Sequence, residues 1–278
     1  RNFTNQGNVG IQGKVMEKIE LKHCMDLDAN DPLRELRSEF LLAETGSIHF
    51  DANSMGAMPK TVPEKVAWML NEGWRNLGRQ GWSKLDWIDQ PKKLGSGIAH
   101  LLGAQPEDVV VCDNTSINLH KLISYAWGIK NSGNILLTES NHFPTDVYIA
   151  EGWIKSLKNY GVDAEIRFAD SHDQLLNCLD ENVAVVNVSY VDYRTSLRWD
   201  MGRLMQKAQE VGALVVWDLS HAAGAVEIDL MGNDADFAVG CGYKYLCGGP
   251  GAPAYLFIHP RHQNKQWPSI PGWMGHLD

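Results

Sequence analysis

The sequence predicts an α/β fold in which helices cover both faces of a mostly parallel sheet. Short apolar runs alternate with helix-like segments along most of the chain, and this alternation is typical of parallel sheets. Several runs, among them Val183–Ser189 and Ala213–Trp217, are rich in β-branched residues and too short for helices, as buried strands are. With 278 residues the chain is long enough to bury one large core.

The composition argues against several classes of partner. The formal net charge of −9 disfavours general binding to nucleic acid or to acidic membranes. No apolar run approaches the length of a membrane span, and the first residues show no signal-peptide pattern. The 5 cysteines contain no C-x-x-C pair, and the 10 histidines form no zinc-type cluster. We therefore expect free thiols, a cytoplasmic location and no metal site.

Residues 1–50 are interpreted as an N-terminal segment. Its beginning is polar, and we expect residues 1–10 to be disordered. The stretch Leu33–Leu42 is predicted to form a short helix, with Pro32 at its first position. A strand that turns into a loop is predicted over Ile48–Asn53.

Helices and an aromatic-rich loop follow. Thr61–Glu64 is a capping-box pattern, and apolar residues at helical spacing continue from it to Leu77. The stretch Gly78–Pro91 contains two tryptophans, which suit either an aryl-substrate pocket or a packing or subunit interface. A further helix is predicted over Leu94–Leu102, ended by Gly103.

The segment Val109–Ile129 predicts a strand, a polar turn and a helix. The strand Val109–Cys112 leads into Asp113–Ser116, and the helix runs over Ile117–Ile129. Free backbone N–H groups and two hydroxyls at a helix N-terminus form a ready anion site. Simple capping by Asn114 or Ser116 explains the same residues without a ligand.

The middle of the chain predicts further strands and one capped helix. Strands are expected over Ile135–Leu137, Ala164–Phe168 and Val183–Ser189. Asp200 is expected to cap a helix that ends before Gly212.

Four polar side chains follow two neighbouring predicted strands. The run Ala213–Trp217 ends at Asp218, with His221 close behind, and the strand Phe237–Gly240 leads into Tyr243 and Lys244. Because ligands in open α/β sheets sit outside the carboxyl ends of strands, we expect these groups to meet in one crevice.

This set of groups suits pyridoxal phosphate. The cofactor needs a lysine amine for a Schiff base and an acid that keeps its pyridine nitrogen protonated, roles that Lys244 and Asp218 would fill. His221 could stack on the ring or bond to it, and Tyr243 could reach the phosphate. Taken singly, each residue is better explained without a ligand, Asp218 as the cap of a turn and Lys244 as a surface residue. Their combination behind buried strands, with glycine-rich turns beside them, favours the cofactor.

These motifs resemble a known group of enzymes. DLSHAAG at residues 218–224, GYKYL at 242–246 and GGPGAP at 248–253 resemble the fold-type-I pyridoxal phosphate enzymes of the class V aminotransferase group. Within it, HFPTDVYIAEG at 142–152 and PGWMGH at 271–276 are similar to the kynureninase family. The matches extend roughly over residues 53–276.

The resemblance implies a cofactor-binding set. Thr115 and Ser116 would contact the phosphate, Phe143 would stack on the ring, and Asp146 would lie at the pyridine edge. Trp273 would reach the phosphate, across a dimer interface. Tyr243 would relay protons beside the catalytic pair Lys244 and Asp218. The full expected set for binding the cofactor is Thr115, Ser116, Phe143, Pro144, Thr145, Asp146, Ser189, Asp218, His221, Tyr243, Lys244 and Trp273.

The resemblance also implies a domain layout. Residues 51–260 would form the cofactor-binding large domain of the fold-type-I enzymes, and residues 261–278 a loop leading to a C-terminal small domain that this chain lacks. That small domain would supply an arginine for the substrate carboxylate, and no arginine here matches that role. We therefore expect a homodimer that binds the cofactor and turns over substrate weakly.

The implied reaction is the hydrolysis of kynurenine or 3-hydroxykynurenine, amino-acid substrates, to anthranilate or its 3-hydroxy form and alanine. Two alternatives remain open at this point. One is another class V reaction, such as transamination or desulfuration, although Cys241 and Cys247 are badly placed for a mobile catalytic cysteine. The other is a fragment that binds the cofactor without activity.

Overall fold

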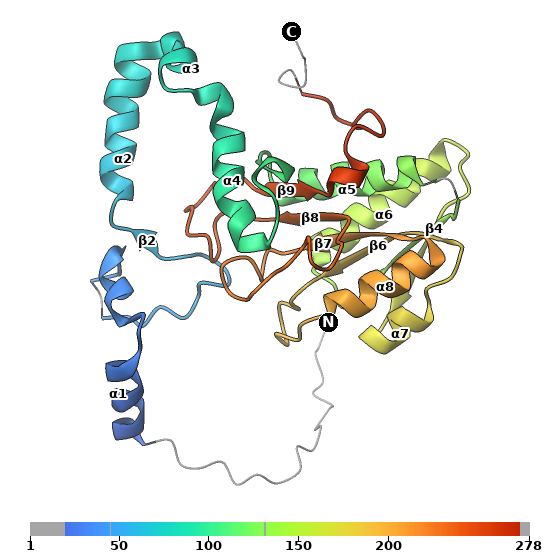
Figure 1. Ribbon diagram of the computed structural model, residues 1–278, viewed down its shortest axis with the longest axis horizontal. Coiled ribbons are helices and arrows are strands. Elements are labelled where there is room, and N and C mark those ends of the chain that lie inside the picture. Colours follow the sequence, from blue (N-terminus) through green and yellow to red (C-terminus); the bar gives the residue numbers. More distant parts are fainter. Residues whose placement is uncertain (1–19, 45, 131, 273–278) are drawn as a thin grey trace, which may run out of the picture. The chain divides into compact units, whose positions relative to one another are not determined.

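The structure is a computed structural model that describes residues 20–44, 46–130 and 132–272. The chain divides into two compact units, Arg1–Phe40 and Leu41–Asp278. Figure 1 shows both, and each is described by itself. No helix in the described ranges has the length and apolar character that a membrane span requires.

The described part of the first unit holds one α-helix and one 3₁₀ helix. The helix α1 spans Leu21–Asn30, which the sequence did not predict, and none of its residues is buried. The helix predicted over residues 33–42 is wrong in type and length: it is a 3₁₀ helix, η1, over Arg34–Glu39. The Leu33 N–H donates to Asp31 Oδ1 over 2.8 Å, which makes a tight turn at its start. The short strand β1 (Phe40–Leu41) follows.

The second unit begins with a segment that leads into a helical arm, which we define as residues 62–89. The strand predicted at residues 48–53 is absent, because no strand pairs with this segment; Ile48 and Phe50 are exposed. After β2 (Met58–Pro59) the predicted helix is confirmed, as α2 (Val62–Trp68) continued by the π-helix η2 (Met69–Leu77).

The arm returns to the sheet through three short helices and one long one. The short ones are η3 (Gly78–Gln80), α3 (Gly81–Lys84) and η4 (Trp87–Asp89). The long helix α4 spans Gln90–Leu102, and Gly103 ends it in the left-handed conformation, as predicted.

The sheet of the second unit has 7 strands in the order β3-β9-β8-β7-β6-β4-β5. Its mostly parallel character is confirmed, since only β9 runs antiparallel to its neighbours. The run of β9 was not predicted as a strand. The strands are β3 (Val109–Val111), β4 (Ile135–Glu139), β5 (Glu165–Ala169), β6 (Val183–Ser189), β7 (Leu214–Asp218), β8 (Phe237–Gly240) and β9 (Tyr255–Ile258).

Helices cover both faces of this sheet, as predicted (Figure 1). On one face α5 (Thr115–Ile129) and α6 (Pro144–Asn159) bury their apolar side chains in one core cluster. On the other face α4, α7 (His172–Asn177) and α8 (Met201–Val211) pack into a second cluster. After β9 the chain forms a 3₁₀ helix, η6 (Pro260–His262).

The direction of the strands decides which loops can meet. Strand β3 is antiparallel to β9, and β9 is antiparallel to β8, so β3 points the same way as the parallel strands. The carboxyl ends of β3, β4, β6, β7 and β8 therefore lie along one edge of the sheet.

Asp236, the residue before β8, links strand β7 to the part of the chain that follows β9. Its side chain is buried, and Oδ2 accepts the Val215 N–H over 2.9 Å. Its Oδ1 accepts from the Arg261 guanidinium over 2.6 Å and lies 2.7 Å from His262 Nε2. A buried carboxylate is tolerated only where such donors compensate it.

We predict that Asp236→Ala lowers the free energy of unfolding by about 3–5 kcal/mol, because it leaves the Val215 N–H without its acceptor and removes the buried carboxylate that Arg261 and His262 share, so that Asp234 is the one acidic partner that Arg261 keeps among the described residues. Asp173→Ala is the control: its carboxylate is exposed and lies 3.4 Å from Arg203 NH1. That change should cost under about 1 kcal/mol. Denaturant unfolding of both variants measures the difference, and equal costs would contradict the role given to Asp236.

Candidate active site

Lys244 lies in the loop that follows β8, and its side chain is buried. Glycines make the loop tight: Gly249 and Gly251 both have φ +82°, a conformation that favours glycine. The Gly56 N–H donates to the Tyr243 carbonyl over 2.9 Å. A Cβ at Gly56 would collide with the Lys244 carbonyl oxygen. The segment before β2, which contains Gly56, thus packs closely against the loop of Lys244.

The Lys244 amine contacts a histidine and an aromatic ring. Its Nζ lies 2.7 Å from His221 Nε2 and 5.6 Å from the centre of the Phe143 ring. Burial lowers the pKa of His221, and the positive charge of Lys244 lowers it further. A neutral imidazole accepts a hydrogen bond at Nε2, so Lys244 is the donor of this pair.

Asp218, at the tip of β7, is held by serine donors. The β6–β7 register places Ser189 opposite Asp218, and the Ser189 hydroxyl donates to Oδ2 over 3.2 Å. The Ser220 N–H and hydroxyl donate to Oδ1 over 2.9 and 2.6 Å. Three donors thus satisfy the oxygens of this buried carboxylate.

Asp146 is a second buried acid, in the first turn of α6. Burial raises its pKa well above the ordinary value, the negative charge of Asp218 raises it further, and Lys244 opposes both. Its Oδ2 has no hydrogen-bond partner among the described residues. Two carboxylates in different environments thus lie near one amine.

The N-terminus of α5 brings hydroxyl side chains to the same edge. Asn114 caps this helix, because its side chain accepts the Ile117 N–H over 3.0 Å. Thr115 and Ser116 occupy the first helical positions, where backbone N–H groups lack partners within the helix. Helix capping and an anion site are compatible in this turn. Asn114 is the capping residue, while Thr115 and Ser116 face a cavity.

One cavity of about 120 Å³ collects most of the predicted site residues. Of the predicted set, Pro144 is the first residue of α6 and does not line it, while Ser189 lies behind Asp218. Trp273 lies outside the described residues. The cavity is lined by Thr115, Ser116, Phe143, Thr145, Asp146, Asp218, Ser220, His221, Tyr243 and Lys244.

Sequence reasoning missed two residues beside this cavity. Ser220 supplies two of the three donors to Asp218. Tyr193 packs edge-on against Phe143, with ring centres 5.2 Å apart, and its ring centre lies 6.2 Å from that of His221. Tyr193 follows the end of β6, so the rule that ligands lie beyond strand ends could have indicated it.

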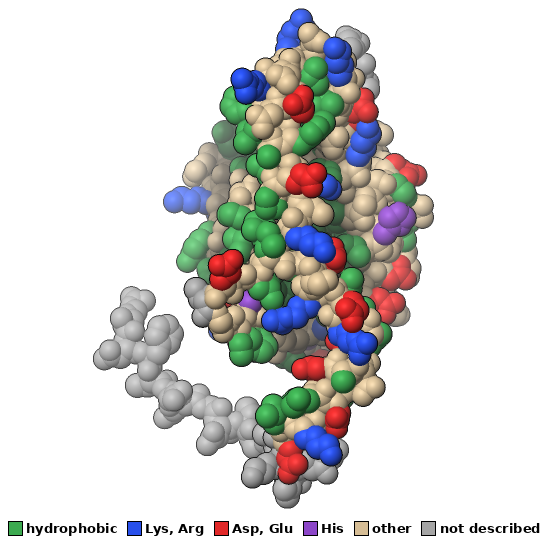
Figure 2. Space-filling view, turned by 90° about the vertical axis from the view of Figure 1, so that its left-hand side faces the viewer, with side chains coloured by type: hydrophobic (Ala, Val, Ile, Leu, Met, Phe, Trp, Pro, Cys, Tyr) green, Lys and Arg blue, Asp and Glu red, His purple; other side chains and the backbone are tan. Residues whose placement is uncertain are grey.

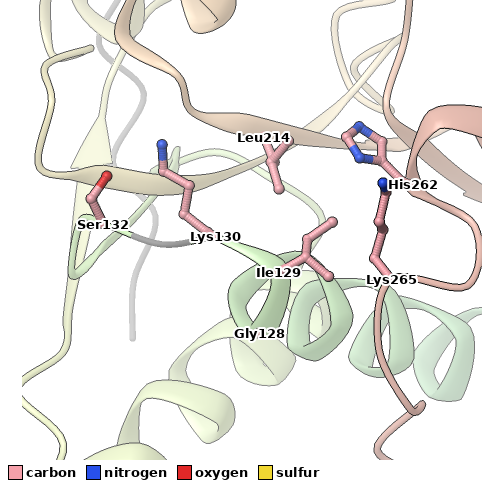
Figure 3. A pocket seen from close by; sticks show the side chains of 7 residues that line it. All are labelled: Gly128, Ile129, Lys130, Ser132, Leu214, His262 and Lys265. Carbon is pink, nitrogen blue, oxygen red and sulfur yellow. The ribbon is translucent and has the colours of Figure 1, made fainter.

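A second cavity, of about 450 Å³, lies at the other edge of the sheet and holds none of the predicted residues. Figure 3 shows Lys130 and Lys265 on either side of the end of α5. Lys130 already donates to the Gly212 carbonyl, and His262 is bound to Asp236. Two of its polar side chains, Lys130 and His262, are therefore engaged in contacts within the fold.

The chain belongs to the aminotransferase class-V family, whose model matches residues 48–272. The fold is that of the large domain of fold-type-I pyridoxal phosphate enzymes. A variant of C-DES with glycine covalently linked to its PLP cofactor has a TM-score of 0.69 at 17% identity, over 82% of this chain and 61% of that one. The cysteine desulfurase CsdA from Escherichia coli has a TM-score of 0.68 at 16% identity, over 83% and 59%. At these identities the likeness shows the fold alone.

Within the family the chain is similar to kynureninases. It is 40% identical to the kynureninase of Pseudomonas fluorescens over 257 residues, which is 91% of this chain and 61% of the relative. It is 39% identical to the kynureninase of Deinococcus radiodurans over 270 residues, 95% of this chain and 64% of the relative. The chain thus spans under two thirds of the length of these relatives.

Packing around the lysine loop leads to a stability prediction. Gly56→Ala should lower the free energy of unfolding by about 1–3 kcal/mol, because the added methyl group must displace the lysine loop. Gly97→Ala is the matched control, since a Cβ there meets nothing within 4 Å in α4, and it should stabilise by up to about 1 kcal/mol. Denaturant unfolding of both variants checks this, and a neutral Gly56→Ala would show that the loop is not tightly held.

Proposed function

We propose that this chain binds pyridoxal phosphate on Lys244 as the cofactor-binding domain of an enzyme that hydrolyses L-kynurenine or 3-hydroxykynurenine. The products would be L-alanine and anthranilate or 3-hydroxyanthranilate. The observation that carries the proposal is the cavity in which a buried amine faces two carboxylates beside a helix N-terminus. The similarity to kynureninases over more than nine tenths of the chain supports the substrate.

The donor set in the cavity fits this cofactor. Lys244 is buried, and among the described residues its amine makes one polar contact, with His221, so it can be reached without breaking an ion pair. Oδ2 of Asp146 and Nδ1 of His221 are buried without hydrogen-bond partners in the described part of the chain. Thr115 and Ser116 present hydroxyls and free N–H groups, which suit a phosphate. Phe143 would lie against the ring.

When bound, the cofactor would supply an electrophilic carbonyl carbon and a ring that withdraws electrons from the substrate α-carbon. Asp218 would hold a proton on the ring nitrogen, and the hydrogen bonds from the two serines would fix the position of its carboxylate. Lys244 Nζ, when released by the substrate amine, would take the α-proton. His221 Nε2, 2.7 Å from Nζ, would orient that amine.

Tyr243 is suited to return a proton. Burial raises the pKa of its hydroxyl, so the group stays protonated at neutral pH and can act as a donor. Tyr243 lines the cavity and directly precedes Lys244 in the sequence.

Desulfuration is the less supported alternative, although solved desulfurases share the fold. Such chemistry needs a reactive thiolate, and burial raises the pKa of both Cys241 and Cys247 in the lysine loop. Burial also raises the pKa of Cys112 to about 11. None of these three cysteines is an activated nucleophile.

The test of the function combines a covalent readout with an assay. Borohydride reduction of the protein loaded with pyridoxal phosphate should place the adduct on Lys244 by peptide mass mapping, with Lys121, which is paired with Asp113, as the internal control. With L-kynurenine the loaded protein should release anthranilate, seen by its fluorescence, and Lys244→Ala should release none. Asp218→Asn should fold normally and slow the release about ten- to a hundredfold, as expected from losing a charged hydrogen bond. Sulfide release from cysteine without anthranilate would favour desulfuration, and an adduct on Lys121 would refute the site.

A homodimer is the proposed assembly. The helical arm and the neighbouring α4 expose large apolar side chains in a concentration that a surface rarely carries without a partner. Figure 2 shows hydrophobic side chains gathered along this face. The residues are Val66, Trp68, Met69, Leu70, Trp74, Trp82, Ile88 and Leu94, each at least 40% exposed.

We predict that the protein sediments as a dimer that buries about 2,000 Å² or more. Trp74→Glu should shift it toward monomer, because Trp74 is 70% exposed on the arm. Tyr160→Glu should not, although Tyr160 is 86% exposed, because it follows α6 away from the arm. Sedimentation velocity measures both variants, and a monomeric parent protein would contradict the assembly.

A further inference from the structure

His142, in the turn between β4 and α6, is fully buried at its side chain and lies behind the cavity. Its ring accepts the Phe143 N–H at Nδ1 over 2.7 Å. A ring nitrogen that accepts a hydrogen bond carries no proton, so the proton of a neutral imidazole must be on Nε2. Burial lowers the pKa of His142, to about 4, which keeps the ring neutral at pH 7. The local backbone therefore selects the Nε2–H tautomer.

This Nε2–H is directed at the less satisfied of the two acids. It lies 3.6 Å from Asp146 Oδ2, and both atoms are buried without a hydrogen bond of ordinary geometry among the described residues, although the Asn187 side chain also faces the His142 ring. Asp218, in contrast, receives three hydrogen bonds from serines. The two carboxylates of the cavity thus have different neighbours, because serines bond to Asp218 and the His142 ring lies beside Asp146.

We propose that His142 is a positioning residue that donates its Nε2–H to Asp146 Oδ2 and leaves the other oxygen of Asp146 to face the pyridine edge of the cofactor, while Asp218 keeps the ring nitrogen. This inference rests on the proposed function for the cofactor, but the orientation of the His142–Asp146 pair does not. His142 touches neither the cavity nor a reacting atom; it acts through Asp146. A movement of a few tenths of an ångström closes the contact to hydrogen-bond length. The donor favours an ionised Asp146, against the burial that raises its pKa.

Two substitutions at this position separate a donor from a space-filling ring. His142→Gln keeps an N–H donor near the place of Nε2, while His142→Phe keeps a ring and removes the donor. Fluorescence titration of the protein with pyridoxal phosphate should show about ten- to a hundredfold weaker binding for His142→Phe, the effect of losing a hydrogen bond to a charged group. His142→Gln should stay within about threefold of the parent protein.

His120→Gln is the matched control, because His120 is a partly buried histidine that packs edge-on against Trp153 and does not line the cavity. It should leave the affinity unchanged. Thermal unfolding of the cofactor-free variants shows whether each one folds. Equal affinity of His142→Phe and the parent, or equal losses for His142→Phe and His142→Gln, would overturn the proposal.

The tautomer itself can be measured without the cofactor. Nitrogen-15 NMR of the histidine rings in the cofactor-free protein should show His142 protonated at Nε2 alone at pH 7. A proton on Nδ1, or on both nitrogens, would overturn the inference whatever the affinities. If the parent protein fails to bind pyridoxal phosphate, the proposed function fails, and this spectrum still decides the role of His142.

Discussion

The site depends on one constraint. The carboxylate of Asp218 is buried at the tip of a central strand, and hydrogen-bond donors must compensate it. An uncompensated charge at that depth would cost several kcal/mol, so donors must converge on it. The β6–β7 register brings Ser189 to one oxygen, and the turn after β7 brings Ser220 to the other. A slip of one residue in this register would point Ser189 to the opposite face of the sheet. The parallel sheet thus sets the charge of the cavity as well as its shape.

The same cavity holds three further ionisable groups whose charges are linked. Burial lowers the pKa of His221 and the charge of Lys244 lowers it further, while the same charge opposes the effect by which Asp218 raises the pKa of Asp146. A buried amine is tolerated here because two acids lie near it. The linkage also gives the acids different roles, since serines support Asp218 and a histidine faces Asp146.

The loop that carries Lys244 is held by elements from distant parts of the chain. Gly56, before the helical arm, contacts the carbonyl groups of this loop, and Tyr193, after β6, packs against Phe143. The arm therefore does more than expose an apolar face, because the segment that leads into it also packs against the loop of Lys244. This connection gives a physical reason why the match to the class V family begins as early as residue 48.

The sequence by itself determined the α/β class, most of the strands and the residues at their carboxyl ends. Buried strands and capped helices leave local signals, so β6, β8 and the Asp200 cap of α8 lie where the patterns indicated. The motif resemblance indicated the class V family, which the family match shows. The signals were weak where no neighbour pairs with the segment, as at Ile48–Asn53, or where a tight turn replaces a helix, as at Arg34–Glu39.

Only the tertiary structure decided which of these residues act on one another. Strand order and register are not encoded in local patterns. They decide that β9 lies between β3 and β8, that serines donate to Asp218, and where Tyr193 packs. The tautomer of His142 depends on a backbone N–H that meets its ring only in the folded turn, and its contact with Asp146 on the start of α6. Residue types and spacing could indicate the groups available for chemistry. Their protonation and pairing follow from distances and burial that exist only once the sheet has formed.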